Sequence, residues 1–389
     1  MMKVPILLIH PPVAKPSEPP AGVARLAGAL RARQVACKVI DANIEGMTYL
    51  LNHSMPAEDT WSRRAYRHRD LHLAALRRPD TYTCSDAYRR AVADVNRLLA
   101  GTGASDGIRV GLADYRDSAL SPVRSADLRY AARHPEKNPF HAYYRNVLLP
   151  RIFRNEPAWV GLSINFLSQA LCAFALIGLL KQTCPNIKLI AGGGLITSWM
   201  QRPGFADAFS NLVDHMAAGP GEAALLKRLG CRPAGAPCLP DYRDLMPQRY
   251  LSPGFILPFS ASAGCWWRRC AFCPEQAERQ PFRPLPHTEA VRQLGRLCRQ
   301  TAPVLIHLLD NAVSPALLKA LTANPPGAPW YGFVRIGAPL DDAAFCKRLA
   351  AAGCAMLQIG LESGHQPVLD RLNKGVRLET AHRVLDNLR

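Results

Sequence analysis

The sequence predicts an α/β protein in which an N-terminal doubly wound parallel sheet is followed by a second series of β/α units. Three observations predict this fold. Short apolar runs alternate with helical stretches at the start of the chain and again from residue 159 onwards. Loops rich in glycine or proline follow several of these runs. A proline-rich stretch with little periodicity, residues 231–254, separates the two series. Strands that alternate with helices pair in parallel through right-handed crossovers.

The composition predicts a globular, cytoplasmic protein. The chain has 389 residues, 48% of them hydrophobic, so it can bury a sizeable core. Its longest apolar stretch, Leu171–Leu180, is about half of the roughly 20 residues that a membrane span needs. The apolar run at the N-terminus is too short for a signal peptide. The formal charge of +18 is scattered along the chain, which argues against nucleic acid as a partner.

The first region, residues 1–230, opens with an apolar strand that ends at two prolines, then a helix and a second strand. From residue 45 to about 150 this rhythm stops, and the stretch is interpreted as a helical insertion over one edge of the sheet. The rhythm then returns. The predicted strands are Val4–Ile9, Ala36–Ile40, Trp159–Ile164, Lys188–Ala191 and Leu212–Ala217, and the main helices are Ala21–Arg33, Ser85–Leu99 and Ser168–Gln182.

The second region, residues 255–389, repeats the alternation and suits a barrel of β/α units. Four strands are predicted, fewer than a complete barrel of this kind would have, so the barrel is expected to be truncated at its C-terminal end. The predicted strands are Ile256–Ser260, Val304–Leu309, Trp330–Val334 and Ala355–Gly360, with helices at Thr288–Arg299, Pro315–Leu321 and Asp341–Ala352.

Three of the twelve cysteines lie on one short loop that follows the first strand of this second region. Cys265, Cys270 and Cys273 are spaced C-x4-C-x2-C. Three thiolates on one loop can hold three irons of a [4Fe–4S] cluster and leave the fourth iron open. A zinc site would need a fourth ligand, and none lies nearby. Iron–sulfur is therefore the favoured interpretation, with zinc or no metal as the alternatives.

With its residues Trp267 and Phe272, the cysteine loop resembles that of the radical S-adenosylmethionine (SAM) superfamily, and more narrowly the branch with an N-terminal cobalamin-binding domain. The resemblance covers most of the chain. It rests on the cysteine loop and, in order, on Pro11–Pro12, Gly192–Gly194, Gly219–Glu222, Pro240–Tyr242, Gly360–Gly364 and Leu372–Gly375.

The resemblance implies a chemistry and its cofactors. The open iron would bind SAM, one electron would cleave SAM to methionine and a 5′-deoxyadenosyl radical, and methylcobalamin could donate a methyl group. The implied activity is a cobalamin-dependent C-methyltransferase acting on a peptide or a small natural-product precursor. A flavodoxin or ferredoxin would deliver the electron. The alternatives are a cobalamin-independent or ring-rearranging radical SAM enzyme and a non-catalytic cobalamin- or metal-binding protein.

The resemblance also implies binding residues. SAM would contact Phe272, Asp310, Glu362 and Ser363, although the Gly-Gly-Glu that is usual near Asp310 is missing. Cobalamin would lie against the loops at the carboxyl ends of the first sheet. Asn43 stands where the usual cobalamin motif has its histidine, so that motif supplies no histidine ligand here. The implied cobalamin-binding residues are Asn43, Ser163, Asn165, Gly193, Gly194, Gly219, Gly221 and Glu222.

Overall fold

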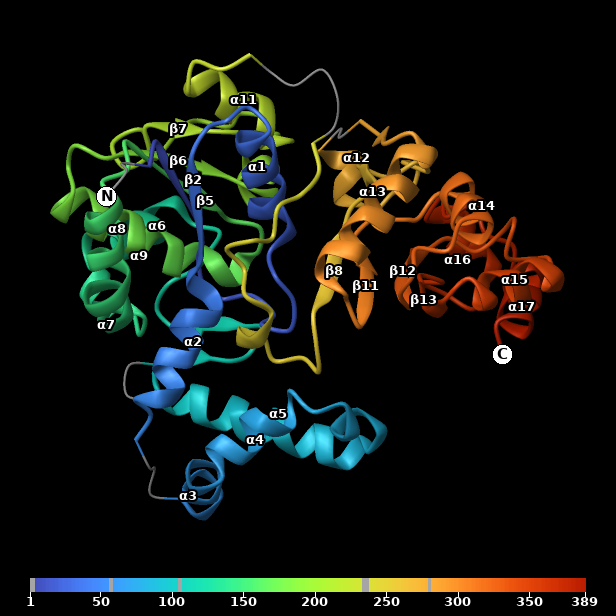
Figure 1. The fold of residues 1–389 in the computed structure, drawn as a ribbon, viewed down its shortest axis with the longest axis horizontal. Coiled ribbons are helices and arrows are strands. Elements are labelled where there is room, and N and C mark those ends of the chain that lie inside the picture. Colours follow the sequence, from blue (N-terminus) through green and yellow to red (C-terminus); the bar gives the residue numbers. More distant parts are fainter. Residues whose placement is uncertain (1–3, 56–58, 104–106, 233–237, 279–280) are drawn as a thin grey trace. The chain divides into compact units, whose positions relative to one another are not determined.

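The computed structural model describes residues 4–55, 59–103, 107–232, 238–278 and 281–389. The chain divides into two compact units, Met1–Pro253 and Gly254–Arg389 (Figure 1). Residues 233–237 of the predicted linker, and residues 56–58 and 104–106 of the predicted insertion, lie outside the described ranges. Among the residues that the structure describes, no helix is long and apolar enough to cross a membrane.

The first unit is built on a five-stranded parallel sheet, as the sequence predicts. Its strand order is β2-β1-β5-β6-β7, so the chain reverses its direction of travel along the sheet between β1 and β5. β1 is buried along its whole length because helices cover both of its faces. The strands are β1 (Ile6–His10), β2 (Cys37–Asp41), β5 (Trp159–Ser163), β6 (Lys188–Gly192) and β7 (His215–Met216).

Helices leave β1 and β5 in opposite directions, and right-handed crossovers therefore place them on opposite faces of the sheet. α1 (Ala21–Arg31) packs against α11 (Gly221–Arg228), while α9 (Leu167–Thr183) packs against α6 (Ser125–Arg133). α9 and α6 cross at Gly178, where a side chain would lie 1.7 Å from the carbonyl oxygen of Ala132. In sheets whose strand order reverses in this way, ligands bind in the crevice outside the carboxyl ends of the two strands concerned, which are β1 and β5 here.

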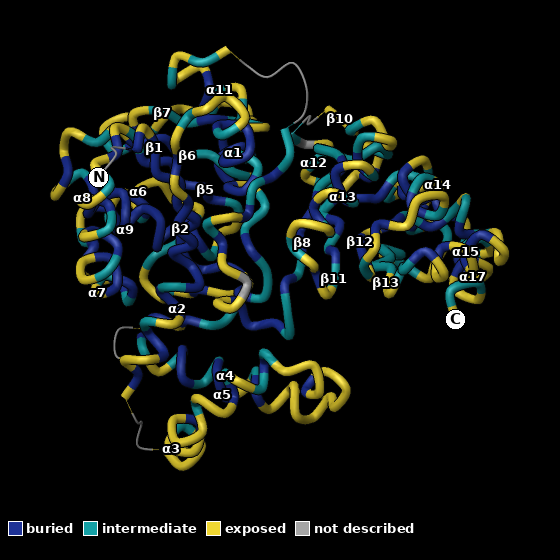
Figure 2. The backbone as a smooth tube through the Cα atoms, viewed as in Figure 1, coloured by how far each residue is buried: buried dark blue, intermediate teal, exposed yellow. Residues whose placement is uncertain are grey.

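Residues between β2 and β5 are mainly helical but include a short hairpin that the sequence analysis missed. The hairpin pairs β3 (Ile108–Val110) with β4 (Tyr115–Asp117). α3 has an almost entirely exposed surface, as its colour in Figure 2 shows. The aromatic side chains of Phe140, Tyr143 and Tyr144 are fully buried. The helices are α2 (Ala42–Asn52), α3 (Thr60–Arg67), α4 (Arg69–Ala75), α5 (Ser85–Gly101), α6, α7 (His141–Tyr143) and α8 (Leu149–Asn155).

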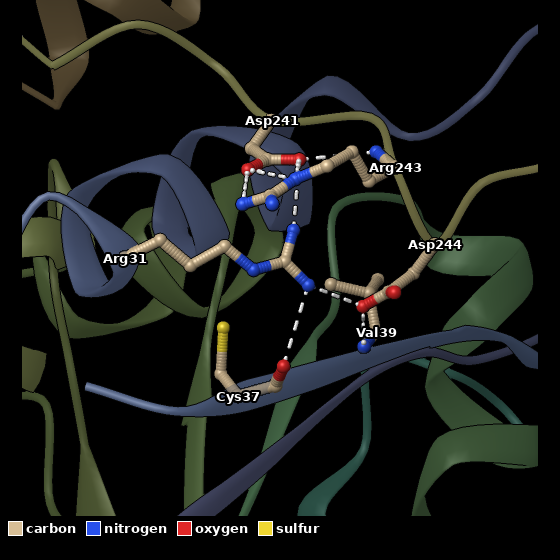
Figure 3. Close-up of polar contacts among 6 residues, drawn as sticks. All are labelled: Arg31, Cys37, Val39, Asp241, Arg243 and Asp244. Atoms are coloured by element: carbon tan, nitrogen blue, oxygen red, sulfur yellow. Dashed lines mark hydrogen bonds and ion pairs between the residues drawn. The ribbon is translucent and has the colours of Figure 1, made fainter. Parts of the chain in front are cut away.

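The described part of the predicted linker, residues 238–253, belongs to the first unit and is held by Arg31 of α1 (Figure 3). The Arg31 guanidinium pairs with Asp241 at 2.8 Å and with Asp244 at 2.5 Å. Asp244 also accepts the backbone N–H of Val39 on the edge strand β2 at 2.9 Å. Arg243 pairs with Asp241 from the solvent side. One guanidinium thus joins this segment to both a helix and a strand.

Replacing Arg31 with glutamine is expected to destabilise the first unit, whereas replacing Arg243 with glutamine is not. The Arg31 side chain is 17% exposed, and its loss removes the guanidinium that pairs with Asp244 and one of the two that pair with Asp241. Breaking a buried pair in this way costs roughly 3 kcal/mol. The Arg243 side chain is 73% exposed, so its pair is worth at most about 1 kcal/mol. Thermal melting of the two variants checks this difference, and equal melting temperatures would contradict it.

The second unit holds a four-stranded parallel sheet in the order β13-β12-β11-β8, so each strand lies beside the next one in the chain. One face of this sheet is closed by helices, and Leu257, Ile306 and Trp330 are fully buried on it. Closure into a barrel stays a prediction. The strands are β8 (Ile256–Phe259), β11 (Leu305–Leu308), β12 (Trp330–Val334) and β13 (Cys354–Ile359), and the helices are α13 (His287–Thr301), α14 (Pro315–Ala323), α15 (Ala343–Ala351), α16 (Gln366–Arg371) and α17 (Leu378–Asn387).

Candidate functional site

The cysteine loop begins at the carboxyl end of β8, the first strand of the second unit. It passes through β9 (Ser262–Ala263), which pairs with β10 (Arg283–Pro284), and ends at α12 (Pro274–Ala277). Cys270 is buried, Cys265 and Cys273 are partly exposed, and all three are free thiols. The structure therefore offers three sulfur ligands on one loop.

The three thiols lie close enough to influence one another. Burial raises the pKa of the Cys273 thiol, and the charges of Cys265 and Cys270 raise this pKa further. Within the described ranges, no three His, Cys, Asp or Glu side chains form a ready site for a single metal ion. A four-iron cluster spaces its thiolates farther apart than a single ion does, because each thiolate binds a different iron. By their chemistry, three thiols on one loop are donors that suit iron–sulfur ligation.

Arg335, which directly follows β12, is the cationic partner of this loop. Its Nη1 donates a hydrogen bond to the sulfur of Cys270 at 3.8 Å. The guanidinium carbon lies 4.1 Å from the ring centre of Trp267. Burial lowers the pKa of Arg335, and the neighbouring Cys270 opposes that shift. The partly buried guanidinium therefore places a positive charge beside one sulfur of the loop.

The segment Leu372–Gly375 braces the cysteine loop from the far end of the unit. The N–H of Ala271 donates to the carbonyl of Leu372 at 2.9 Å, and Trp267 Nε1 donates to the carbonyl of Asn373 at 3.2 Å. Arg335 also donates to the carbonyl of Lys374. At Gly375 the backbone has a φ of +64°, and a side chain would lie 2.1 Å from the Trp267 ring. Only glycine fits this contact without displacing the tryptophan.

Two of the predicted SAM-binding residues, Phe272 and Glu362, are linked by Lys374. The Lys374 ammonium lies 5.5 Å from the centre of the Phe272 ring and pairs with Glu362 at 2.9 Å. The Phe272 side chain is half exposed, so it remains available to a ligand. Glu362 has a φ of +71°, a left-handed conformation that is strained for a residue with a side chain. Ser363 accepts the N–H of His365 at 3.1 Å and shapes the following turn.

Asp310, the fourth predicted SAM-binding residue, is almost fully buried behind the cysteine loop. Its carboxylate accepts the N–H of Ala261 at 3.0 Å and the hydroxyl of Ser262. Burial raises the pKa of Asp310, and these two bonds partly offset the shift. Asp310 therefore fastens the start of the cysteine loop to the end of β11, and its role in SAM binding stays a prediction.

In the first unit, Ser163 and Asn165 close the end of β5 onto the loop after β6. The Asn165 amide donates to the Ser163 hydroxyl at 3.1 Å and accepts the N–H of Gly194 at 3.1 Å. Gly193 has a φ of +109°, and a side chain there would lie 2.4 Å from the carbonyl of Ile164. These residues form one compact loop pair at the carboxyl edge of the sheet.

The glycines after β7 have different surroundings. Gly219 has a φ of +73°, donates its N–H to the Thr197 hydroxyl at 2.9 Å, and has open space where a side chain would point. Gly221 begins α11 and packs against Leu26. Glu222 pairs with Arg25 of α1 at 2.6 Å, so its carboxylate joins two helices. Of these three residues, Gly219 is the one that leaves room for a bulky ligand.

Asn43 is buried and its amide is already bonded at both ends. It accepts the N–H of Ala14 and donates to the carbonyl of Ala14, each at 2.9 Å. The side chain therefore holds the loop that follows β1. His10, at the end of β1, is also buried, and burial lowers its pKa to about 4, so it is neutral at pH 7. The Gln169 amide lies 3.4 Å from Nε2 of this ring and helps to enclose it.

Sequence reasoning missed Gln169, Arg335 and Lys374 as organising residues. Gln169 is fully buried, accepts the N–H of Asn165 and donates to the carbonyl of Pro11, which ties the two strands of the crevice together. The sequence does mark Gln169, because it is a polar residue within an otherwise apolar helical stretch. Arg335 carried a comparable signal as a charged residue directly after an apolar strand. Phe166 and Leu167, exposed by 55% and 47%, add an apolar rim beside Gln169.

Asp41, at the end of β2, is a buried carboxyl group whose protonation makes the stability of the first unit depend on pH. It caps α2 by accepting the N–H groups of Asn43 and Ile44, and it accepts the hydroxyl of Tyr250 at 2.9 Å. Burial raises the pKa of Asp41 to about 7 despite these bonds. The folded protein therefore binds a proton that the unfolded chain releases near pH 4.

The free energy of unfolding is expected to fall as the pH rises from about 4 to about 7. Over this range the folded protein keeps the proton on Asp41 and the unfolded chain does not, so a rising pH favours the unfolded chain. Asp41→Asn, which stays neutral, should remove that component while keeping the cap. Asp59→Asn is the matched control, since Asp59 caps α3 in the same way but its pKa is lowered. Melting temperatures across this pH range check the expectation. A parallel pH profile for the wild type and Asp41→Asn would contradict it.

Comparison with solved structures finds this fold in two enzymes. OxsB, a cobalamin-dependent SAM radical enzyme solved with aqua-cobalamin and SAM bound, matches with a TM-score of 0.59 and 14% identity over 99% of this chain and 48% of OxsB. TsrM, a radical SAM methyltransferase from Kitasatospora setae solved with cobalamin and a [4Fe–4S] cluster bound, matches with a TM-score of 0.54 and 13% identity over 99% of this chain and 67% of TsrM.

The chain thus spans about half the length of OxsB. No protein-family model matches it, and no curated protein matches it. The structural likeness covers nearly the whole chain and includes both parallel sheets. It confirms, at the level of the fold, the resemblance inferred from the cysteine and glycine loops. The chain adopts the fold of the cobalamin-dependent radical SAM enzymes.

Proposed function

We propose that this chain belongs to a radical SAM enzyme that holds a [4Fe–4S] cluster and SAM in its second unit and cobalamin in its first. The observation that carries the proposal is the position of three free thiols on one loop at the carboxyl end of β8. This is where a series of parallel β/α units presents its catalytic groups. The match to OxsB, solved with cobalamin and SAM, and to TsrM, solved with cobalamin and a [4Fe–4S] cluster, supports the same assignment.

Cys265, Cys270 and Cys273 would ligate three irons of the cluster. When bound, the cluster supplies the electron that cleaves SAM, and cobalamin supplies a methyl group. Arg335 would donate to a ligand sulfur and offset the negative charge that the cluster adds to a partly buried loop. The Leu372–Gly375 segment would keep the three cysteines of the loop in position to hold the cluster.

Phe272 and Glu362 are the residues proposed to receive SAM. The half-exposed Phe272 ring offers a surface for the adenine. The Glu362 carboxylate, held beside Lys374, would accept hydrogen bonds from polar groups of SAM. Glu362 is 38% exposed, so a ligand can reach it without breaking the core.

In the first unit, the open space at Gly219 and the apolar rim of Phe166 and Leu167 fit a large ligand with an extended tail. Among the described residues of this edge, no histidine is placed to ligate cobalt, because His10 is buried and Asn43 is bonded to Ala14. We therefore propose that cobalamin binds here without a histidine ligand. The methyl acceptor would be a peptide or a small natural-product precursor, and a flavodoxin or ferredoxin would supply electrons.

Anaerobic incubation of the cluster-loaded protein with SAM, a reductant and methylcobalamin tests the proposal. Formation of 5′-deoxyadenosine together with S-adenosylhomocysteine supports radical methyl transfer. 5′-Deoxyadenosine alone would instead indicate a cobalamin-independent or rearranging enzyme. Neither product, from protein that carries the cluster, would favour a non-catalytic binding protein.

A further inference from the structure

A cavity with a volume of about 530 Å³ lies in the first unit. It is formed by α2, by the helical stretch around Tyr143–Arg151, and by the segment that contains Arg249. None of the residues proposed to bind cobalamin lines it. Its size falls within the range of small-molecule sites, which is about 300–1,000 Å³. This cavity involves the insertion between β2 and β5, to which the proposed function assigns no role.

The lining of the cavity carries an excess of positive charge. Its charged side chains are Arg77, Arg151 and Arg249 against Glu45 alone. The Glu45 carboxylate, 12% exposed, already accepts bonds from Arg151 at 2.6 and 2.7 Å, from Arg249 at 2.6 Å and from the Tyr143 hydroxyl at 2.9 Å. One carboxylate cannot neutralise three guanidinium groups, so a net charge of about +2 faces the cavity.

The arginines retain the capacity to bind an anion. Arg151 and Arg249 each bond to Glu45 through Nη1, and both side chains are more than a third exposed. Arg77 donates to the backbone carbonyls of Leu73, Arg249 and Tyr250, which fixes its position but leaves its charge uncompensated. A guanidinium held by neutral acceptors beside two others is a typical setting for carboxylate or phosphate recognition.

Aromatic and apolar side chains line the rest of the cavity. The rings of Tyr49 and Tyr143 are 6.0 Å apart and tilted by 53°, and Ile44 and Val147 also line the cavity. The ring of His53 stacks on the ring of Tyr49, with the two ring centres 4.0 Å apart. Rigid aromatic surface next to fixed cations suits a ligand that has a flat apolar part and a charged group.

We propose that this cavity binds a small organic anion in which a planar ring carries a carboxylate or a phosphate. The guanidinium groups of Arg249 and Arg151 receive the anion. The partly exposed ring of Tyr49 contacts the ligand ring, and the fully buried Tyr143 supports Tyr49 from within the unit. The site is separate from the proposed cofactor sites and does not depend on them. It gives the insertion between β2 and β5 a function in binding a ligand.

Calorimetric titration of the full chain with phenyl phosphate, benzoate and inorganic phosphate tests this site. Saturable binding of one ring-bearing probe, at least tenfold tighter than inorganic phosphate, is expected. The better of the two ring probes then identifies the anion as phosphate or carboxylate. Arg249→Gln should weaken this binding at least tenfold. The Arg249 side chain is 47% exposed and Glu45 keeps Arg151 and Tyr143, so the variant should melt like the wild type.

Arg145→Gln is the matched control. Arg145 is exposed and lies on the same helical stretch as Tyr143 and Val147, but it does not line the cavity. Its replacement removes one positive charge without touching the site, so binding should be unchanged. No saturable binding by either ring probe would overturn the proposal. So would equal binding by Arg249→Gln and the wild type, or equal loss in Arg145→Gln.

Discussion

Cys270→Ser is expected to abolish cluster binding and to lower the rate of SAM cleavage by at least about a thousandfold. Cys270 is the buried member of the three cysteines and the one that accepts a hydrogen bond from Arg335. A serine oxygen is a harder ligand than a thiolate and does not suit iron–sulfur sites. The replacement would also remove the sulfur that accepts the hydrogen bond of the partly buried Arg335. Iron and sulfide content after anaerobic reconstitution, and the amount of 5′-deoxyadenosine formed, check the prediction.

Cys298→Ser is the matched control for this variant. Cys298 is a partly buried thiol on α13, and burial raises its pKa as it does for Cys273. It lies outside the cysteine loop, so its replacement should leave the iron content unchanged. Full iron content in Cys270→Ser, or equal loss in Cys298→Ser, would show that the loop does not hold the cluster as proposed.

Gly375→Val is expected to destabilise the second unit by about 2–5 kcal/mol and to reduce cluster retention. The new side chain would lie 2.1 Å from the Trp267 ring, in a backbone conformation with a φ of +64° that valine rarely adopts. Both the steric overlap and the left-handed backbone cost free energy. Trp267 would have to leave the carbonyl of Asn373, which detaches the brace from the cysteine loop.

Gly364→Val provides the comparison, because no atom lies within 4 Å of the position where its side chain would begin. It is a loop glycine of the same unit without a positive φ. Thermal melting and iron content should therefore stay close to those of the wild type. Similar melting temperatures for Gly375→Val and Gly364→Val would contradict the proposed bracing of the cysteine loop.

The strand and helix pattern could be predicted because the first-unit strands are short, apolar and bounded by glycine or proline. β1 and β5 are buried, and a continuous apolar run is the signal that such strands leave. The hairpin of β3 and β4 was missed because each strand has only three residues and lies beside helical sequence. Strand pairs of this length leave almost no periodicity to detect.

The cysteine loop could be predicted because its ligands are adjacent in sequence, whereas the contacts that organise the loop are not. Arg335 meets Cys270 from 65 residues away, and Trp267 meets Asn373 from 106 residues away. Glu222 pairs with Arg25 across 197 residues. Such pairings depend on how helices and strands pack, and a single sequence does not display that packing.

Electron paramagnetic resonance of the reduced, iron-reconstituted protein tests the central claim most directly. The account predicts the signal of a reduced [4Fe–4S] cluster that changes when SAM is added, because one iron is left without a protein ligand. It also predicts that this signal is missing in Cys270→Ser and present in Cys298→Ser. A protein that takes up no iron, or a cluster signal that SAM leaves unaltered, would contradict the assignment of this loop as the site of SAM chemistry.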